Sequence, residues 1–329
     1  MSRTTKTTQF GPLIVLALAA TLMAEFFTGS TPLSRAYELG SELIMYGSGV
    51  IVIRETIRRL RLGWASILLL GMAYGLTEEG LVLQSVLNPH FMGLDISFGR
   101  MAGVNWVWAE FITGLHCFWS ITGSIILAEL IFFKKRQEPW LSKTGLWITG
   151  LVFAVICIAM HMLFIRLFHF TAGPLPLVAL AVIVAAVIFL ALRQAPASAA
   201  VSGTHPRTSR PFWMIALITF LAAVAWFLGL ASVFSGKNLG PLMVFIAGLV
   251  VLGVYFYIVR RLFSLDMHDY TQRLAVATGL LASELIWGYW LTRQNSLDHG
   301  AQILCIIGVA LMVYFLHRQR KQPAPSVDL

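Results

Sequence analysis

Apolar residues recur in long runs along almost the whole chain, and most charged residues fall between the runs. A helix needs about 20 residues to cross the hydrocarbon core of a bilayer. Ten runs come close to this length: 10–28, 37–53, 64–86, 104–133, 145–168, 174–192, 212–234, 240–259, 272–291 and 301–317. The pattern predicts an all-α polytopic integral membrane protein with about ten transmembrane helices.

The distribution of Lys and Arg predicts the orientation of these spans. Positive residues collect in cytoplasmic loops. With the N-terminus inside, 19 of the 24 Lys and Arg residues lie in inside segments, and the others are Arg35, Arg100, Arg166, Lys237 and Arg293. We therefore expect an N-in/C-in, multi-pass protein of the cell (plasma) membrane. The first span, with its basic start, also fits a signal peptide, so its retention or cleavage is left open.

Composition agrees with the membrane class. Hydrophobic residues make up 58% of the chain and charged residues 12%, whereas a soluble domain has about 25% charged residues. The net charge of +9 is explained by the topology and by contact with anionic headgroups. The lipid bilayer is the expected partner, and nucleic acid is not. Nothing in the pattern indicates an oligomeric state.

A composition change divides the chain. Residues 193–210 are rich in Ala, Ser, Pro and Thr and predict a flexible cytoplasmic linker. Residues 1–192 then form a six-span N-terminal bundle with an intramembrane Glu/His cluster, and residues 211–329 form a four-span C-terminal bundle with a short basic tail. The role of the second bundle is not indicated.

The stretch AYGLTEEGLVL carries the candidate chemistry, because Glu78 and Glu79 stand inside a span. An acidic residue at bilayer depth costs roughly 2.5–3.5 kcal/mol and is a functional candidate by default. At 1.5 Å of rise per residue, several ionisable groups reach the outer half of the membrane. We expect these groups to face one another around a wet cavity: Glu25, Glu42, Glu78, Glu79, Glu110, His116 and His161.

The residue types suit activation of a water. Two neighbouring carboxylates cannot both ionise cheaply, so one holds a proton while the other accepts one. We assign catalytic roles to Glu78, Glu79, His116 and His161, and supporting polar roles to Glu42, Glu110, Thr113, Ser120 and Cys157. The alternative is a hydrogen-bonded polar cluster that only holds helices together.

A bound metal is not predicted. His and carboxylate ligands suit zinc, but the chain has no His-Glu-x-x-His motif. No cofactor is therefore expected, with zinc as the one possibility.

The glycine-flanked glutamate pair, the following helix GLHCFWSITGSIILAEL and a third helix with a deep His together resemble a known group. The likeness is to glutamic-type intramembrane proteases, the PrsW-like and the CAAX-processing and bacteriocin-processing group, over residues 64–168. The resemblance implies a peptide or membrane-protein substrate cleaved by a water that glutamates and histidines activate. The motif is degenerate, because Gly80 to Leu83 follow the pair where that group usually has a basic residue.

Two other classes remain open. Gly-interrupted spans with carboxylates also occur in proton- or cation-coupled membrane transporters. A non-enzymatic membrane scaffold subunit, held together by polar contacts, would show the same composition. Neither the substrate nor the activity of the site follows from the sequence.

Overall fold

A computed structural model of the chain describes residues 8–91, 98–194, 211–235, 240–258, 267 and 269–319. In these residues the chain is helical apart from one short hairpin, β1 (Arg100–Met101) with β2 (Val104–Asn105). The label α marks α-helices, η1, η3 and η4 are π-helical turns, and η2 and η5 are short 3-10 turns. In chain order the elements are α1 (Phe10–Thr21), η1 (Leu22–Phe26), η2 (Leu33–Arg35), α2 (Leu39–Leu60), α3 (Trp64–Leu76), η3 (Thr77–Val82), α4 (Trp106–Leu115), η4 (His116–Gly123), α5 (Ser124–Ile131), η5 (Phe133–Lys135), α6 (Lys143–Phe168), α7 (Pro174–Leu192), α8 (Phe212–Ser235), α9 (Pro241–Tyr257), α10 (Tyr270–Leu291) and α11 (Ser296–Gln319). Each of the ten predicted spans has a helical counterpart, which confirms the all-α polytopic class.

Length and hydropathy single out the membrane-crossing helices. Seven helical stretches of the described residues are long and apolar enough to cross a membrane, and the shorter stretches Phe10–Phe26 and Pro241–Tyr257 are also apolar. The α6 helix buries only Met160, and α7 buries only Val184 and Ala191. Their exposed leucines, valines and isoleucines suit contact with lipid chains.

The α2 helix, which corresponds to the predicted second span, belongs to neither of these groups of apolar helices and is longer than its apolar run. The run predicted residues 37–53, but α2 continues to Leu60 and carries Arg54, Glu55, Arg58 and Arg59 in its last two turns. These charges stay within a buried helix because they pair with opposite charges and backbone carbonyls. The prediction ended too early because hydropathy counts each charge singly and ignores its partner.

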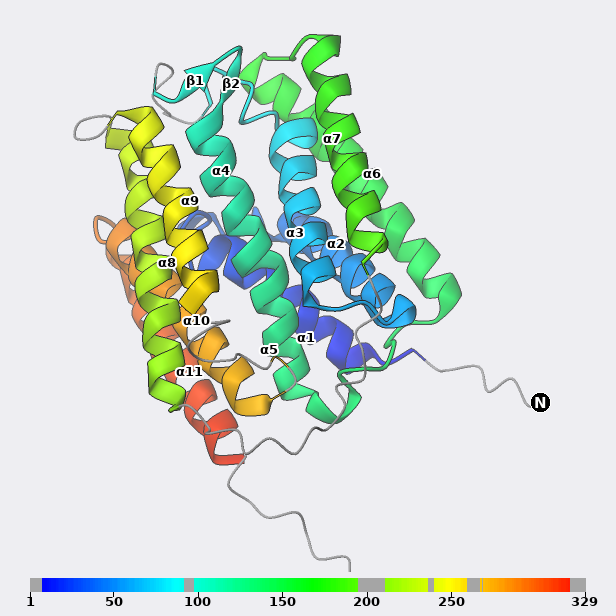
Figure 1. Ribbon diagram of the computed structural model, residues 1–329, viewed down its shortest axis with the longest axis vertical. Coiled ribbons are helices and arrows are strands. Elements are labelled where there is room, and N and C mark those ends of the chain that lie inside the picture. Colours follow the sequence, from blue (N-terminus) through cyan, green and yellow to red (C-terminus); the bar gives the residue numbers. More distant parts are fainter. Residues whose placement is uncertain are drawn as a thin grey trace, which may run out of the picture.

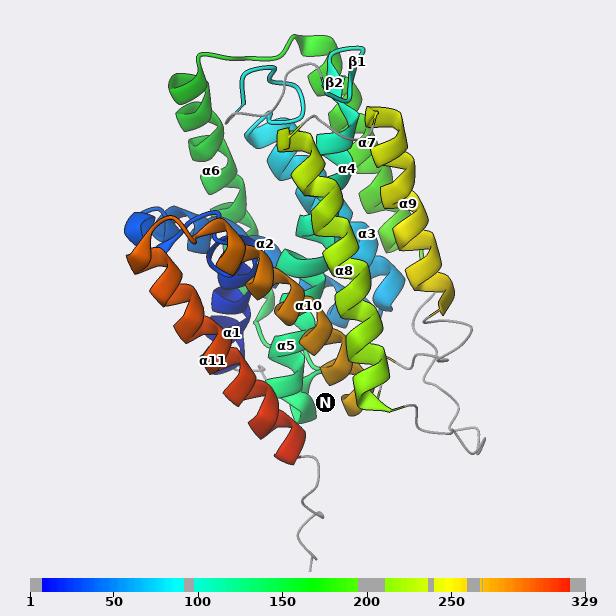
Figure 2. The ribbon, with the colours of Figure 1, turned by 90° about the vertical axis from the view of Figure 1, so that its left-hand side faces the viewer.

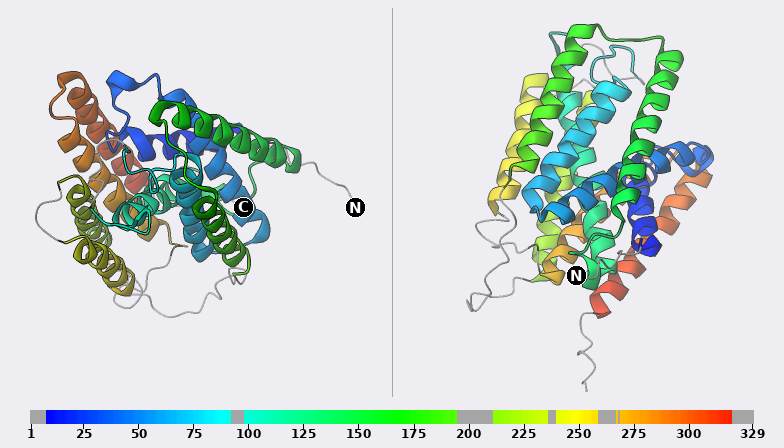
Figure 3. Two further views of the ribbon diagram at one scale, coloured as in Figure 1. Left: turned by 90° about the horizontal axis from the view of Figure 1, so that it is seen from above. Right: turned by 90° about the vertical axis from the view of Figure 1, so that its right-hand side faces the viewer.

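The helices form one tilted bundle. In Figure 1, α3, α4, α6, α7, α8 and α9 rise to the end that carries β1 and β2. Figure 2 shows the α1–α2 and α10–α11 connections next to each other at about half this height. In the right-hand view of Figure 3, α6 and α7 stand on either side of α3, and both contact its last turn, η3.

A buried ion network closes the opposite end. Glu129 of α5 accepts hydrogen bonds from Arg54 and Arg58 of α2 and from Arg273 of α10, at 2.7–3.3 Å. The Arg54 guanidinium also stacks 3.4 Å above the Trp140 ring. The ends of α2 and α5 and the start of α10, which meet here, all lie next to loops predicted to be cytoplasmic. Their contact agrees with the predicted order of inside and outside loops.

The two predicted bundles share one hydrophobic core. Residues of α4, η4 and α5 pack with residues of α8 and α10 in a single cluster of buried side chains. The Trp119 indole donates to the Leu280 carbonyl at 3.1 Å, and Gln302 donates to the Phe26 carbonyl at 2.6 Å. The predicted linker, apart from Arg193 and Gln194, lies outside the described residues.

Candidate functional site

Three helices change to π-helical turns where they carry the candidate acids and base. The turn η1 contains Glu25, η3 contains Glu78 and Glu79, and η4 contains His116 and Ser120. A π-turn adds a residue to a helical turn, rotates the following side chains and is common at functional sites. These turns bring side chains from three separate spans to one place.

Glu79 and His116 form the centre of the site. The His116 Nε2 atom lies 3.1 Å from Glu79 Oε1, and both residues are buried. The second oxygen of Glu79 accepts a hydrogen bond from Ser85, whose hydroxyl accepts one from the Trp108 indole at 2.9 Å. Glu79 is therefore held at both oxygens, which fixes the orientation of its carboxylate.

Glu78 faces the other side of the same imidazole. Its Oε2 atom lies 3.5 Å from His116 Nδ1 and has no hydrogen-bond partner among the described residues. The Ser120 hydroxyl lies 3.3 Å from the same Nδ1. The imidazole thus stands between two carboxylates, one held by hydrogen bonds and one free to accept a proton.

A chain of polar groups leads from this centre to the start of α2. The Thr31 hydroxyl donates a hydrogen bond of 2.8 Å to Glu42 Oε1 and lies 3.1 Å from Glu25 Oε2. The Glu42 side chain is half-buried. Tyr46 donates to the other oxygen of Glu25 at 2.7 Å, and its ring stacks 5.8 Å from the His116 ring. These polar groups lie between the centre and the end of α2 that is predicted to face outside.

Two glycines let α3 approach the helix that carries His116. A Cβ atom added at Gly75 would lie 3.1 Å from the Cβ of His116 and from the Cα of Thr113. One added at Gly71, a helical turn earlier, would lie 3.1 Å from the Cα of Cys117. The absence of side chains at both positions allows the backbones to come close enough for Glu78 and Glu79 to reach the imidazole.

Three predicted site residues, His161, Glu110 and Thr113, take positions away from this centre, whereas Cys157 interacts electrostatically with Glu78 and so lies near it. The His161 Nδ1 atom lies 3.0 Å from the Val82 carbonyl oxygen at the end of η3, and Cys157 lies on the same helix. Glu110 packs its carboxyl against Gly248 of α9 and has no hydrogen-bond partner among the described residues. Thr113 is buried beside Gly75, and its hydroxyl is also without a partner there. The catalytic role of His161 stays a prediction.

Sequence reasoning missed three members of the site, Tyr46, Ser85 and Trp108, and placed a fourth, Glu25, in the cluster without giving it a role. Glu25 lies in η1, at the end of the first helix, and Tyr46 lies on α2. Ser85 follows η3, and Trp108 lies in the first turn of α4. A signal existed for Glu25, since it is an acidic residue at the end of an apolar run. For Tyr46, Ser85 and Trp108 there was none, because such residues are ordinary near membrane surfaces.

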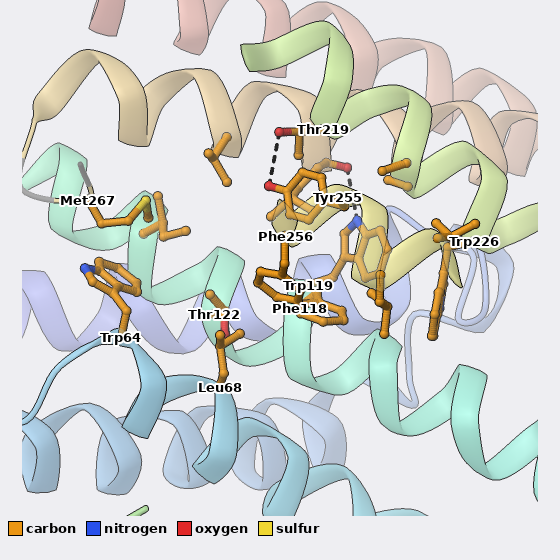
Figure 4. A pocket seen from close by; sticks show the side chains of 17 residues that line it. Trp64, Leu68, Phe118, Trp119, Thr122, Thr219, Trp226, Tyr255, Phe256 and Met267 are labelled. Carbon is orange, nitrogen blue, oxygen red and sulfur yellow. Dashed lines mark hydrogen bonds between the residues drawn. The ribbon is translucent and has the colours of Figure 1, made fainter. Parts of the chain in front are cut away.

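A cavity of about 180 Å³ lies elsewhere in the bundle, between α3, η4, α8, α9 and α10. Figure 4 shows the rings of Phe118, Trp119 and Tyr255 around it, with a contact of 3.3 Å between the hydroxyls of Thr219 and Tyr255. Its lining is almost entirely apolar and contains no carboxylate or imidazole. The cavity therefore offers room for an apolar group and no acid or base.

Comparison with known proteins gives a family. A family model described as an uncharacterized membrane protein family matches residues 14–327. The chain belongs to this family. The match covers both predicted bundles and supports a membrane protein, but it gives no support to the resemblance to glutamic intramembrane proteases. No curated protein and no solved structure matches the chain.

Proposed function

We propose that this membrane protein is a hydrolase that uses Glu78, Glu79 and His116 to activate a water near the outer face of the bilayer, with a peptide segment of a membrane protein as substrate. The observation that carries the proposal is the meeting of two buried carboxylates and an imidazole from separate spans. Buried acidic groups in a membrane are costly, so a purely structural use of so many is a poor explanation.

The hydrogen bonds suggest a division of roles. Glu78 Oε2 has no donor among the described residues, so it can accept a proton from the attacking water. Glu79, fixed by Ser85, orients His116, and the imidazole stabilises negative charge on the substrate carbonyl oxygen. The side chains of Thr31, Glu25 and Tyr46 carry protons between the centre and the outer surface.

The test compares protein termini in membranes of cells that lack the chain and are complemented with wild type, Glu78→Gln or Glu110→Gln. Glu110→Gln is the matched control, because that carboxyl lies against α9 outside the centre. Mass spectrometry of labelled N-termini should find new termini with wild type and the control that are absent with Glu78→Gln at equal protein level. A set of termini that is the same in all three strains would refute peptide hydrolysis.

A second function, proton- or cation-coupled transport, is favoured by one observation. The linked groups of Glu42, Thr31, Glu25 and Tyr46 form a path of the kind that relays protons. In liposomes with an imposed pH gradient, a transporter would show proton uptake that Glu25→Gln reduces. An equal pH change in liposomes with wild type, with the variant and without protein would exclude it.

A further inference from the structure

We propose that Glu78, Glu79 and His116 bind one divalent transition-metal ion, for which Zn²⁺ is the probe. The inference rests on the residues of the proposed function and changes the role of Glu78: with the ion bound, its carboxylate is a ligand, and the ion activates the water. One ligand atom from each of the three residues lies within 4.8 Å of the other two. All three side chains are at least nine-tenths buried.

The distances suit the contraction that an ion would produce. Zinc is bound at about 2.0–2.2 Å by nitrogen and oxygen, so two ligands of a tetrahedral ion lie about 3.4 Å apart. Glu79 Oε1 lies 3.1 Å from Nε2 of His116, close to this separation, whereas Glu78 Oε2 lies 3.5 Å from the other ring nitrogen, Nδ1, which the same ion would not bind. An ion on one ring nitrogen would draw toward it the carboxylate that now faces the other nitrogen, since the three ligand atoms already lie within 4.8 Å of one another, and would leave a fourth position for water.

One buried oxygen of Glu78 lacks a close hydrogen-bond donor among the described residues. This atom is fully buried and lies 3.5 Å from His116 Nδ1, and no donor is at hydrogen-bond distance among the described residues, although the Tyr46 and Tyr74 hydroxyls face the carboxyl. A buried carboxylate oxygen without a hydrogen bond costs free energy. Among the described residues, the ion pairs of Glu78 and Glu79 are both with His116, so two acidic groups share one base. A divalent cation would supply the positive charge that this centre lacks.

The surrounding hydrogen bonds resemble the outer shell of a metal site. Metal-binding carboxylates and imidazoles are held by further hydrogen bonds that fix their orientation. Ser85, itself held by Trp108, binds the outer oxygen of Glu79, and Ser120 lies next to the His116 ring. An ion here would act as a Lewis acid toward a bound water.

The test uses the full chain, purified into lipid nanodiscs, treated with a chelator and then incubated with Zn²⁺ alone. Elemental mass spectrometry should find one Zn²⁺ per wild-type chain, and titration should show at least tenfold weaker binding in Glu79→Gln and His116→Gln. Glu284→Gln on α10 and His299→Gln on α11 are the matched controls, because each removes a residue of the same type outside the centre, and both should bind as wild type does.

A variant that keeps all three ligands distinguishes weaker metal binding from loss of folding. Ser85→Ala keeps all three ligands and should weaken Zn²⁺ binding by about 10–100-fold, the usual effect of removing an outer-shell partner. Its folding is checked by its elution profile and tryptophan fluorescence. Wild-type protein that binds no Zn²⁺, or binds it no more tightly than the ligand variants, would overturn the inference.

The two proposals can fail separately. Zinc bound at these residues without termini that depend on Glu78 overturns peptide hydrolysis and leaves the metal site standing. Termini that depend on Glu78 in a protein that binds no Zn²⁺ overturn the metal site alone.

Discussion

The two adjacent glutamates contact opposite nitrogens of one imidazole. Glu78 lies near Nδ1 of His116 and Glu79 near Nε2, although the residues are neighbours in the chain. Their environments also differ, since Glu79 is held by Ser85 while an oxygen of Glu78 has no hydrogen-bond partner among the described residues. Two chemically identical residues can therefore take different roles, one as a positioning group and one as a base.

Tyr46 provides a prediction at the scale of one atom. Tyr46→Phe removes the hydroxyl that donates to Glu25 at 2.7 Å and leaves that carboxyl oxygen without its donor. We expect the free energy of unfolding to fall by about 1 kcal/mol. Denaturation with SDS in mixed micelles measures the change. Tyr37→Phe is the control, because Tyr37 is 80% exposed, and equal stability of both variants would contradict the role of the hydroxyl.

The sequence identified part of the site at this scale. Charged residues within apolar runs singled out Glu78, Glu79 and His116, because each is costly in lipid without a partner. The same argument could not show that Glu110 lies outside the site, where its carboxyl faces Gly248 of α9. Depth along a span follows from the sequence, but the direction around the helix depends on packing.

At the scale of elements, the π-helical turns determine which side chains meet. A regular helix keeps a constant rotation of about 100° per residue, whereas a π-turn changes it locally. The chain places such turns at Leu22–Phe26, Thr77–Val82 and His116–Gly123. No residue pattern predicted them, because the turns depend on tertiary contacts between the helices.

The close approach of α3 and η4 leads to a prediction. Gly75→Ala adds a Cβ atom 3.1 Å from atoms of both Thr113 and His116, so the two helices must separate. We expect loss of stability by about 1–3 kcal/mol, as for overpacking of a core. SDS unfolding of the purified protein measures it. Gly150→Ala is the matched control, since that helical position has no atom within 4 Å, and an equal effect there would refute the packing argument.

At the scale of the whole molecule, one carboxylate joins the two predicted bundles. Glu129 of α5 accepts hydrogen bonds from α2, in the first bundle, and from α10, in the second. All the participating groups are almost completely buried. Removing one partner from such a network leaves charges without compensation, so the network couples the folding of the two halves.

Glu129→Gln should therefore be severely destabilising. The change leaves Arg54, Arg58 and Arg273 with much less negative charge, and we expect a loss of about 3–5 kcal/mol. Membrane protein yield and SDS unfolding measure it. Glu138→Gln is the control, because that side chain is exposed and only its backbone carbonyl accepts from Arg54. A Glu129→Gln protein as stable as this control would show that the network contributes little.

The sequence by itself determined the class, an all-α polytopic membrane protein, and the positions of most of its apolar helices. These follow from the free energy of transferring each side chain into lipid, a property that adds along the chain and needs no knowledge of neighbours. Only the tertiary structure decided that Glu25, Glu78, Glu79 and His116 share one site, that Glu110 faces another helix and that α2 continues through its charged residues. The reason is that the cost of a buried charge depends on its partner, and partners from distant spans are known only once the helices have packed.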